Sequence, residues 1–104
     1  MDTITKNQPD ALKAAANVYT FIMENDKVRV LDVKFRPGDK AAMHYHPDHV
    51  VYVLNDGTIK ITAADGKSMN VELKKGQAIW MQAGRHSAEN IGKTESHNVV
   101  VELK

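Results

Sequence analysis

The chain has 104 residues, five histidines, no cysteine and a formal net charge of +1. The absence of cysteine excludes disulfide scaffolds, cysteine-ligated zinc sites and cysteine nucleophiles. The lysines are scattered among acidic residues, which excludes the basic surface of a typical nucleic-acid-binding protein. No apolar stretch approaches the ~20 residues that cross a bilayer, and the N-terminal sequence lacks the basic start and apolar core of a signal peptide. We therefore expect one small cytoplasmic domain without nucleic-acid or membrane partners.

The first predicted element is a short helix. Residues 10–16 (DALKAAA) follow Pro9 and are rich in strong helix formers. We expect residues 1–16 to form an N-terminal arm that extends from the domain and packs on a neighbouring molecule. Residues 17–104 are expected to form one compact barrel domain.

The remainder of the chain predicts strands. Residues 28–35, 50–54, 58–62, 69–73, 78–81 and 99–103 are β-branched, aromatic or alternating in hydropathy. Turn signals separate these segments, and the Asp65-Gly66 pair predicts a hairpin. Many short strands without intervening long helices favour an all-β antiparallel sandwich or barrel.

Alternation along the last predicted strand separates two faces. Val99, Val101 and Leu103 lie on one face, opposite Glu102 and Lys104. We expect the apolar face to be buried and the charged face to meet solvent. Other apolar and aromatic side chains are expected to pack inside the barrel or to line a cavity within it: Met43, Tyr45, Tyr52, Trp80 and Met81.

The histidines are unevenly placed, because three of the five lie within six residues. In a strand, His44 and His46 project from the same face with Cα atoms roughly 6.5–7 Å apart. Neutral imidazoles at that spacing can converge on one metal ion, although such a pair is also typical of a solvated surface. His49 is a third candidate ligand, and His86 follows a later turn from which an antiparallel strand can return to the same point. His97 falls in a turn region, where we expect it to be exposed.

Two longer motifs contain these histidines. Residues 38–57, GDKAAMHYHPDHVVYVLNDG, resemble the first motif of the cupins, G(x)5HxH(x)3 or 4 E(x)6G. Residues 76–90, GQAIWMQAGRHSAEN, resemble the second cupin motif, G(x)5PxG(x)2H(x)3N. The resemblance implies a small single-domain cupin, a double-stranded β-helix or jelly-roll barrel that is usually homodimeric. It also implies a metal ion held by His44, His46 and His86.

The chain departs from these motifs at three positions. Gln82 replaces the proline of the second motif, and the spacing between Gly84 and His86 is one residue shorter; we expect both changes to alter only the turn. Val50 stands where the family has its glutamate ligand, so the usual carboxylate is absent, and the preceding His49 is the only nearby replacement. If Val50 points inward, His49 points away. The sequence permits either register, with a bulge at the preceding turn absorbing the slip if His49 points inward.

A site built from neutral imidazoles leaves the charge of a divalent ion uncompensated and should favour anions. We expect iron, nickel, manganese or zinc as the metal and a small anionic metabolite as the ligand. Three protein ligands leave open positions on a six-coordinate ion. Three-histidine iron sites occur in cupin thiol and diketone dioxygenases, so one hypothesis is a dioxygenase-like enzyme.

The alternative hypothesis is a noncatalytic metal-binding or small-molecule-binding cupin, such as a sensor in amino-acid catabolism. The small size favours it, because little chain remains for a lid or an elaborate pocket. The pattern HPDHVVYVL with AGRHSAEN is similar to small bacterial cupins associated with β-alanine degradation. That similarity implies a metabolic context without specifying a reaction.

Overall fold

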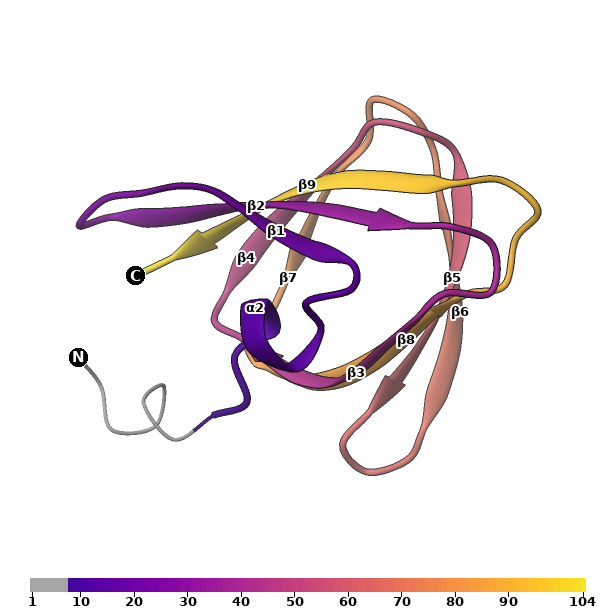
Figure 1. Cartoon of the computed structure of the whole chain (residues 1–104), viewed down its shortest axis with the longest axis horizontal. Coiled ribbons are helices and arrows are strands. Elements are labelled where there is room, and N and C mark those ends of the chain that lie inside the picture. The colour runs from indigo at the N-terminus through magenta and orange to yellow at the C-terminus, as the bar shows by residue number, and fades with distance from the viewer. Residues whose placement is uncertain (1–7) are drawn as a thin grey trace.

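Two facing antiparallel sheets make up the protein (Figure 1). The computed structural model describes residues 8–104. The elements in this part are helix α2 (Ala11–Ala14) and strands β1 (Tyr19–Glu24), β2 (Val28–Phe35), β3 (Lys40–His46), β4 (His49–Val53), β5 (Gly57–Ala63), β6 (Ser68–Leu73), β7 (Ala78–Met81), β8 (Gly84–Asn90) and β9 (Ser96–Leu103). One sheet has the strand order β1-β2-β9-β4-β7 and the other β3-β8-β5-β6. The predicted all-β jelly-roll fold class is confirmed.

The hairpin between β5 and β6 forms at the predicted turn. Thr62 pairs with Ser68 at the end of the two strands. The N–H of Gly66 donates a hydrogen bond of 2.9 Å to the carbonyl of Ala63. Gly66 has a φ of +88°, in the left-handed region that favours glycine. The Asp65-Gly66 pair therefore supplies the backbone freedom that this turn requires.

Strands β3 and β8 form although neither contains a β-branched residue. Their sequences are KAAMHYH and GRHSAEN. The two strands pair with each other, and β8 also pairs with β5. Pairing within the sheet thus overrides the weak intrinsic preference of these sequences for strand conformation. The result places two distant segments side by side, and both carry histidine.

The faces of β9 are the reverse of the prediction. Val100 and Glu102 are buried inside the sandwich, whereas Leu103 is exposed and Val99 and Val101 are half-buried on the outer face. The prediction was wrong because alternation separates two faces without showing which one the second sheet covers. An acidic side chain therefore lies in the interior, where the sequence pattern placed a valine.

Three of the large apolar side chains expected in the interior lie at the surface. Met43, Tyr52 and Trp80 are exposed, so they neither pack inside the barrel nor line a cavity within it. Met81 is partly buried and packs against the core, as expected. Tyr52 and Trp80 lie on β4 and β7, where the neighbouring residues occupy the inner face.

Rows of paired side chains cross the inner face of the five-stranded sheet, and two of these rows matter for the site. We call the first the polar row; it consists of Arg29, Glu102 and His49, and ends at Met81. The second, the aliphatic row, consists of Leu31, Val100, Val51 and Ile79. The two rows are two residues apart on each strand. The aliphatic row belongs to the hydrophobic core, and the polar row faces the histidines of the other sheet.

The N-terminal helix packs on the barrel of its own chain, where it contacts β3 and β1 (Figure 1). The Asp10 carboxylate caps the helix and accepts a hydrogen bond of 3.2 Å from the N–H of Leu12. Ala11 and Ala15 are fully buried. Residues 10–15 therefore pack against their own barrel and do not extend away from it. Residues 1–7 of the predicted arm lie outside the described residues, and packing on a neighbouring molecule stays a prediction. Between residues 8 and 104, no helix has the length and apolar character needed to cross a membrane.

Candidate metal centre

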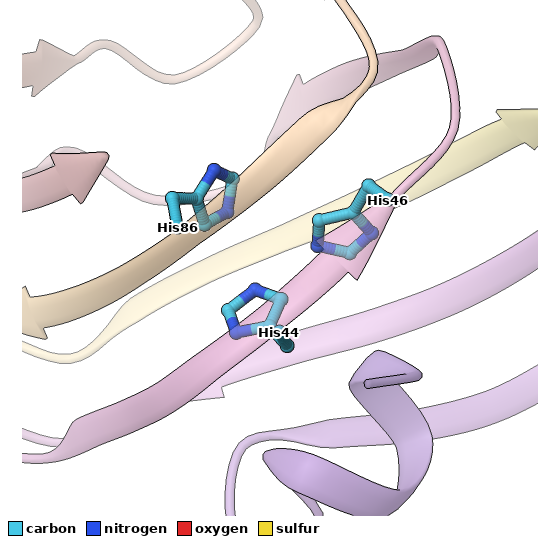
Figure 2. Close-up of side chains that lie close together, drawn as sticks. All are labelled: His44, His46 and His86. Atoms are coloured by element: carbon cyan, nitrogen blue, oxygen red, sulfur yellow. The ribbon is translucent and has the colours of Figure 1, made fainter. Parts of the chain in front are cut away.

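Two neighbouring strands bring three histidines together in the interior. His44 and His46 lie on β3 and His86 lies on β8, where the strand register pairs it with His44. Figure 2 shows the three rings gathered beside these two ribbons. One ring nitrogen of each residue lies within 4.8 Å of those of the other two. The structure thus assembles the predicted cluster of an HxH pair with a histidine from a later strand.

His49 enters the same interior from the opposite sheet. The chain leaves β3 at His46, crosses through Pro47 and Asp48, and enters β4 in the five-stranded sheet. His49 is 2% exposed, and its ring centroid lies 4.6 Å from that of His46. Val50 consequently points to the outer face. His49 and not Val50 therefore points inward, because the chain changes sheets between β3 and β4 and not because of a bulge. His49 lies outside the group of three histidines whose ring nitrogens are within 4.8 Å of one another.

The Nδ1 atom orients three of these rings. His46 Nδ1 lies 2.5 Å from a carboxylate oxygen of Glu102. The Nδ1 atoms of His44 and His49 lie 2.7 and 2.8 Å from the carbonyl oxygens two residues before them. Because these oxygens can only accept, each Nδ1 carries the proton and donates it. When the ring is neutral, its Nε2 atom therefore keeps its lone pair, which is the arrangement that supports metal binding.

Glu102 links the histidines to two ion pairs that lead from the interior to the partly exposed Asp10. Its carboxylate also accepts a hydrogen bond of 2.7 Å from Arg29 Nε, and Arg29 forms a second ion pair of 2.6 Å with Asp10. Burial alone would raise the pKa of Glu102, but the hydrogen bonds from His46 and Arg29 outweigh burial and hold this pKa below its ordinary value. Glu102 is therefore a negatively charged carboxylate beside His46.

Burial favours the neutral imidazole at His44, His49 and His86. It lowers the pKa of His44 to about 4 and, together with the neighbouring imidazoles, the pKa of His86 to about 3. Burial and the proximity of His46 also lower the pKa of His49. Neutral imidazole is the protonation state that binds metals. The donor set therefore fits a transition metal that prefers nitrogen ligands.

The comparison with protein families agrees with this geometry. The cupin domain profile matches residues 31–102, which include all the interior histidines. The chain belongs to the cupin domain family. This match confirms the resemblance seen in the two motifs, whereas the similarity to cupins of β-alanine degradation stays a prediction. No curated protein sequence matches this cupin significantly.

Solved cupin structures share the fold. A cupin domain from Bordetella pertussis Tohama I is 27% identical; the alignment covers 94% of this chain and 97% of that chain, with a TM-score of 0.77. A double-stranded β-helix domain protein from Klebsiella pneumoniae is 19% identical, with coverage of 99% and 88% and a TM-score of 0.68. An RmlC-like cupin family protein from Methanocaldococcus jannaschii is 16% identical, with coverage of 99% and 85% and a TM-score of 0.65. The last two show the fold alone.

Two interior residues of this cupin lie outside the sequence prediction. Tyr19 donates a hydrogen bond of 2.9 Å from its hydroxyl to His46 Nε2, and the same hydroxyl oxygen lies 3.3 Å from His44 Nε2. Burial, with a contribution from the charge of Glu102, raises the pKa of Tyr19, so the hydroxyl is protonated. A single acid within the apolar segment VVVEL was the available signal for Glu102. Tyr19 lies outside both motifs, and nothing in the sequence points to it.

His97 stands apart from the three-histidine group. It lies within β9 and not in the expected turn, and its side chain is 25% exposed. Its Nε2 donates a hydrogen bond of 2.7 Å to the Asp32 carboxylate, on the outer face of the five-stranded sheet. His97 therefore serves as a natural control for experiments on the interior histidines.

Proposed function

We propose that this cupin binds a divalent transition metal through His44, His46 and His86, and that the loaded site binds a small anionic metabolite. His49 is available as a further ligand. The observation that carries the proposal is the convergence of three ring nitrogens within 4.8 Å in the interior. The fixed tautomers of His44 and His46 support it, because rings already oriented lose little freedom when they bind a metal.

The charge balance of the site supports an anionic ligand. The three-histidine group contains no carboxylate, so neutral donors surround the divalent ion. Glu102 contacts His46 but lies outside the three-histidine group, and its carboxylate shares Arg29 with Asp10. A small anion at an open position would therefore neutralise charge that the protein leaves uncompensated.

Such a site could belong to an oxygenase or to a noncatalytic binding protein, and a different observation favours each. A bound iron would supply redox chemistry, and the resemblance to three-histidine cupin dioxygenases favours an oxygenase. The depth of the site favours the alternative of a noncatalytic binding or sensor cupin, since His44 has no exposed surface and His46 is 1% exposed. Only a small ligand reaches donors buried to this extent without rearrangement of the barrel.

Metal analysis of purified variants tests the ligand assignment. We expect the parent to bind about one ion per chain, and we expect His44→Ala and His86→Ala to lose most of it. His97→Ala is the matched control, because it removes a histidine that lies outside the group. Equal metal content in all four proteins, measured by mass spectrometry after dialysis against a defined metal mixture, would contradict the proposal.

A ligand screen on the metal-loaded protein separates the two uses. Small carboxylates, including β-alanine, are the first compounds to test because of the predicted charge preference and the similarity to cupins of β-alanine degradation. A binder raises the melting temperature by mass action and is recovered unchanged. An oxygenase consumes dioxygen in proportion to product. Stabilisation by neutral analogues but not by carboxylates would contradict the predicted preference for anions.

We also propose that the expected homodimer forms through the outer face of the five-stranded sheet. Strand register aligns an apolar row across all five strands on this face: Met23, Val30, Val101, Val50 and Trp80. The row contains no charge, and both of its ends are exposed. A second copy of the chain would cover it. Sedimentation velocity should show a dimer that dissociates in Trp80→Glu, and a dimer unaffected by this substitution would exclude this surface.

A further inference from the structure

Tyr19 reaches the histidine cluster from outside both cupin motifs. It is the first residue of β1, at the edge of the five-stranded sheet, and its side chain crosses the interior toward β3. Its ring centroid lies 5.1 Å from that of His44 and 5.2 Å from that of His46. The hydroxyl is thus placed at the histidine group and not at the surface.

The hydroxyl oxygen faces two ring nitrogens, which carry lone pairs when the rings are neutral. The Nδ1 protons of His44 and His46 are directed to Ala42 and Glu102, so both Nε2 atoms present lone pairs. The single proton of the Tyr19 hydroxyl can serve only one of them at a time. Three electron-pair donors, one oxygen and two nitrogens, therefore converge on one small region of the interior.

The separations among these atoms match those within a metal coordination sphere. With metal–ligand bonds of ~2.1 Å, adjacent ligand atoms are roughly 3.0 Å apart in octahedral geometry and roughly 3.4 Å apart in tetrahedral geometry. The Tyr19 oxygen lies 2.9 Å from His46 Nε2 and 3.3 Å from His44 Nε2. An ion bound by both nitrogens would therefore have this oxygen within bonding reach.

We propose that Tyr19 provides an oxygen ligand to the metal, in place of the carboxylate that is absent at Val50. The inference rests on the proposed metal site. On binding, the O–H bond of the phenol breaks, the oxygen bonds to the metal and the proton passes to the buffer. The phenolate comes from a strand on the opposite side of the sandwich from His44 and His46. It cancels one of the two positive charges that the histidines leave uncompensated, and the other remains for a small anionic ligand.

Copper(II) is the probe for this ligand, because it has the highest affinity among divalent first-row metals for sites of nitrogen and oxygen donors. The chelator-treated full-length protein receives one equivalent of copper sulfate, and its visible spectrum is recorded together with its copper content. We expect an intense phenolate-to-copper charge-transfer band that is lost in Tyr19→Phe while copper stays bound. Tyr45→Phe is the matched control; Tyr45 lies between His44 and His46 on β3, where alternation points it to the other face.

The outcomes separate this inference from the proposed function. Copper held in a histidine-dependent manner, with the same spectrum in the parent and in Tyr19→Phe, overturns the role of Tyr19 and leaves the metal site standing. Failure of the parent to bind copper, or equal binding by His44→Ala, overturns both. If Tyr19→Phe does not fold, resonance Raman excitation of the parent decides the matter: tyrosinate vibrations support the ligand, and their absence from the copper-loaded protein overturns it.

Discussion

The polar row and the aliphatic row lie on the same face of the same sheet, yet they are stabilised differently. Leu31 and Val100 in the aliphatic row gain from burial of apolar surface and from close packing. In the polar row, Glu102 accepts hydrogen bonds from Arg29 and His46. A sheet can hold charged side chains in its interior when each has a partner, but the loss of one partner leaves the other buried and unpaired.

The largest effect is expected from breaking the polar row at Arg29. Replacing Arg29 with Met leaves the Glu102 carboxylate without its cationic partner and also removes the ion pair with Asp10, which caps α2. We expect a loss of about 3–5 kcal/mol in the free energy of unfolding at neutral pH. The loss should be smaller at pH 5 than at pH 7, because the carboxylate is protonated more easily once Arg29 no longer lowers its pKa. Urea denaturation at both pH values measures it.

Arg36→Met is the matched control for this change. The Arg36 side chain is 80% exposed and approaches Asp39 only at 3.7 Å. Surface ion pairs of this kind contribute about 0–1 kcal/mol. Similar losses of stability in the two variants would contradict the central role of the ion pair between Arg29 and the buried Glu102 carboxylate.

A substitution in the aliphatic row is expected to reduce stability by an amount that does not depend on pH. Leu31→Ala removes a side chain with no exposed surface and leaves a cavity, at a cost of about 2–5 kcal/mol in the free energy of unfolding. This loss should be the same at pH 7 and pH 5, because no titrating group loses its partner. A loss that changed strongly with pH would show that the two rows are coupled more tightly than their separate contacts imply.

The histidines make the stability of the metal-free protein depend on pH. The pKa of His44 is lowered from 6.5 to about 4 in the fold, so between these pH values the unfolded chain binds more protons than the folded chain. Stability is therefore fully present above pH 6.5 and falls on acidification, by about 3 kcal/mol for His44 alone. Denaturation in the presence of a chelator from pH 7 to pH 4 measures this slope.

A substitution at His44 tests whether this residue causes the pH dependence of stability. His44→Gln should flatten the pH dependence, because glutamine does not titrate in this range. His97→Gln is the control, since His97 lies outside the histidine group. A pH dependence that is equal in the two variants would assign the effect to other groups.

The smallest effect distinguishes the two faces of β9. Val100→Thr places a hydroxyl in the buried aliphatic row, where an unpaired polar group costs about 1–3 kcal/mol. Val101→Thr makes the same change on the half-buried outer face, where we expect a difference within about 0.5 kcal/mol. Thermal unfolding of the pair measures the difference. A larger loss of stability for Val101→Thr than for Val100→Thr would support the orientation predicted by alternation alone, in which Val101 faces the interior.

Most of the predicted site follows from local patterns. The spacing of His44 and His46 places them on one face of any strand, and the second motif supplied His86 through the family resemblance. The pairing of β3 with β8 then gathered them. Glu102 was placed on the wrong face, because strand alternation has the same form whichever face is covered. Tyr19 was not predicted, because its hydroxyl contacts His44 and His46 across the sandwich. These histidines are 25 residues or more away from Tyr19 along the chain.

The sequence by itself determined the all-β fold, the turn at Asp65-Gly66 and the shared face of His44 and His46. These features depend on turn chemistry and strand geometry, which act over a few residues. Only the tertiary structure decided that His49 points inward and Val50 outward, and that Glu102 and Tyr19 join the interior. The physical reason is that burial belongs to a pair of sheets: a side chain is inside only with respect to the layer that covers it, and the crossing between β3 and β4 exchanges one layer for the other.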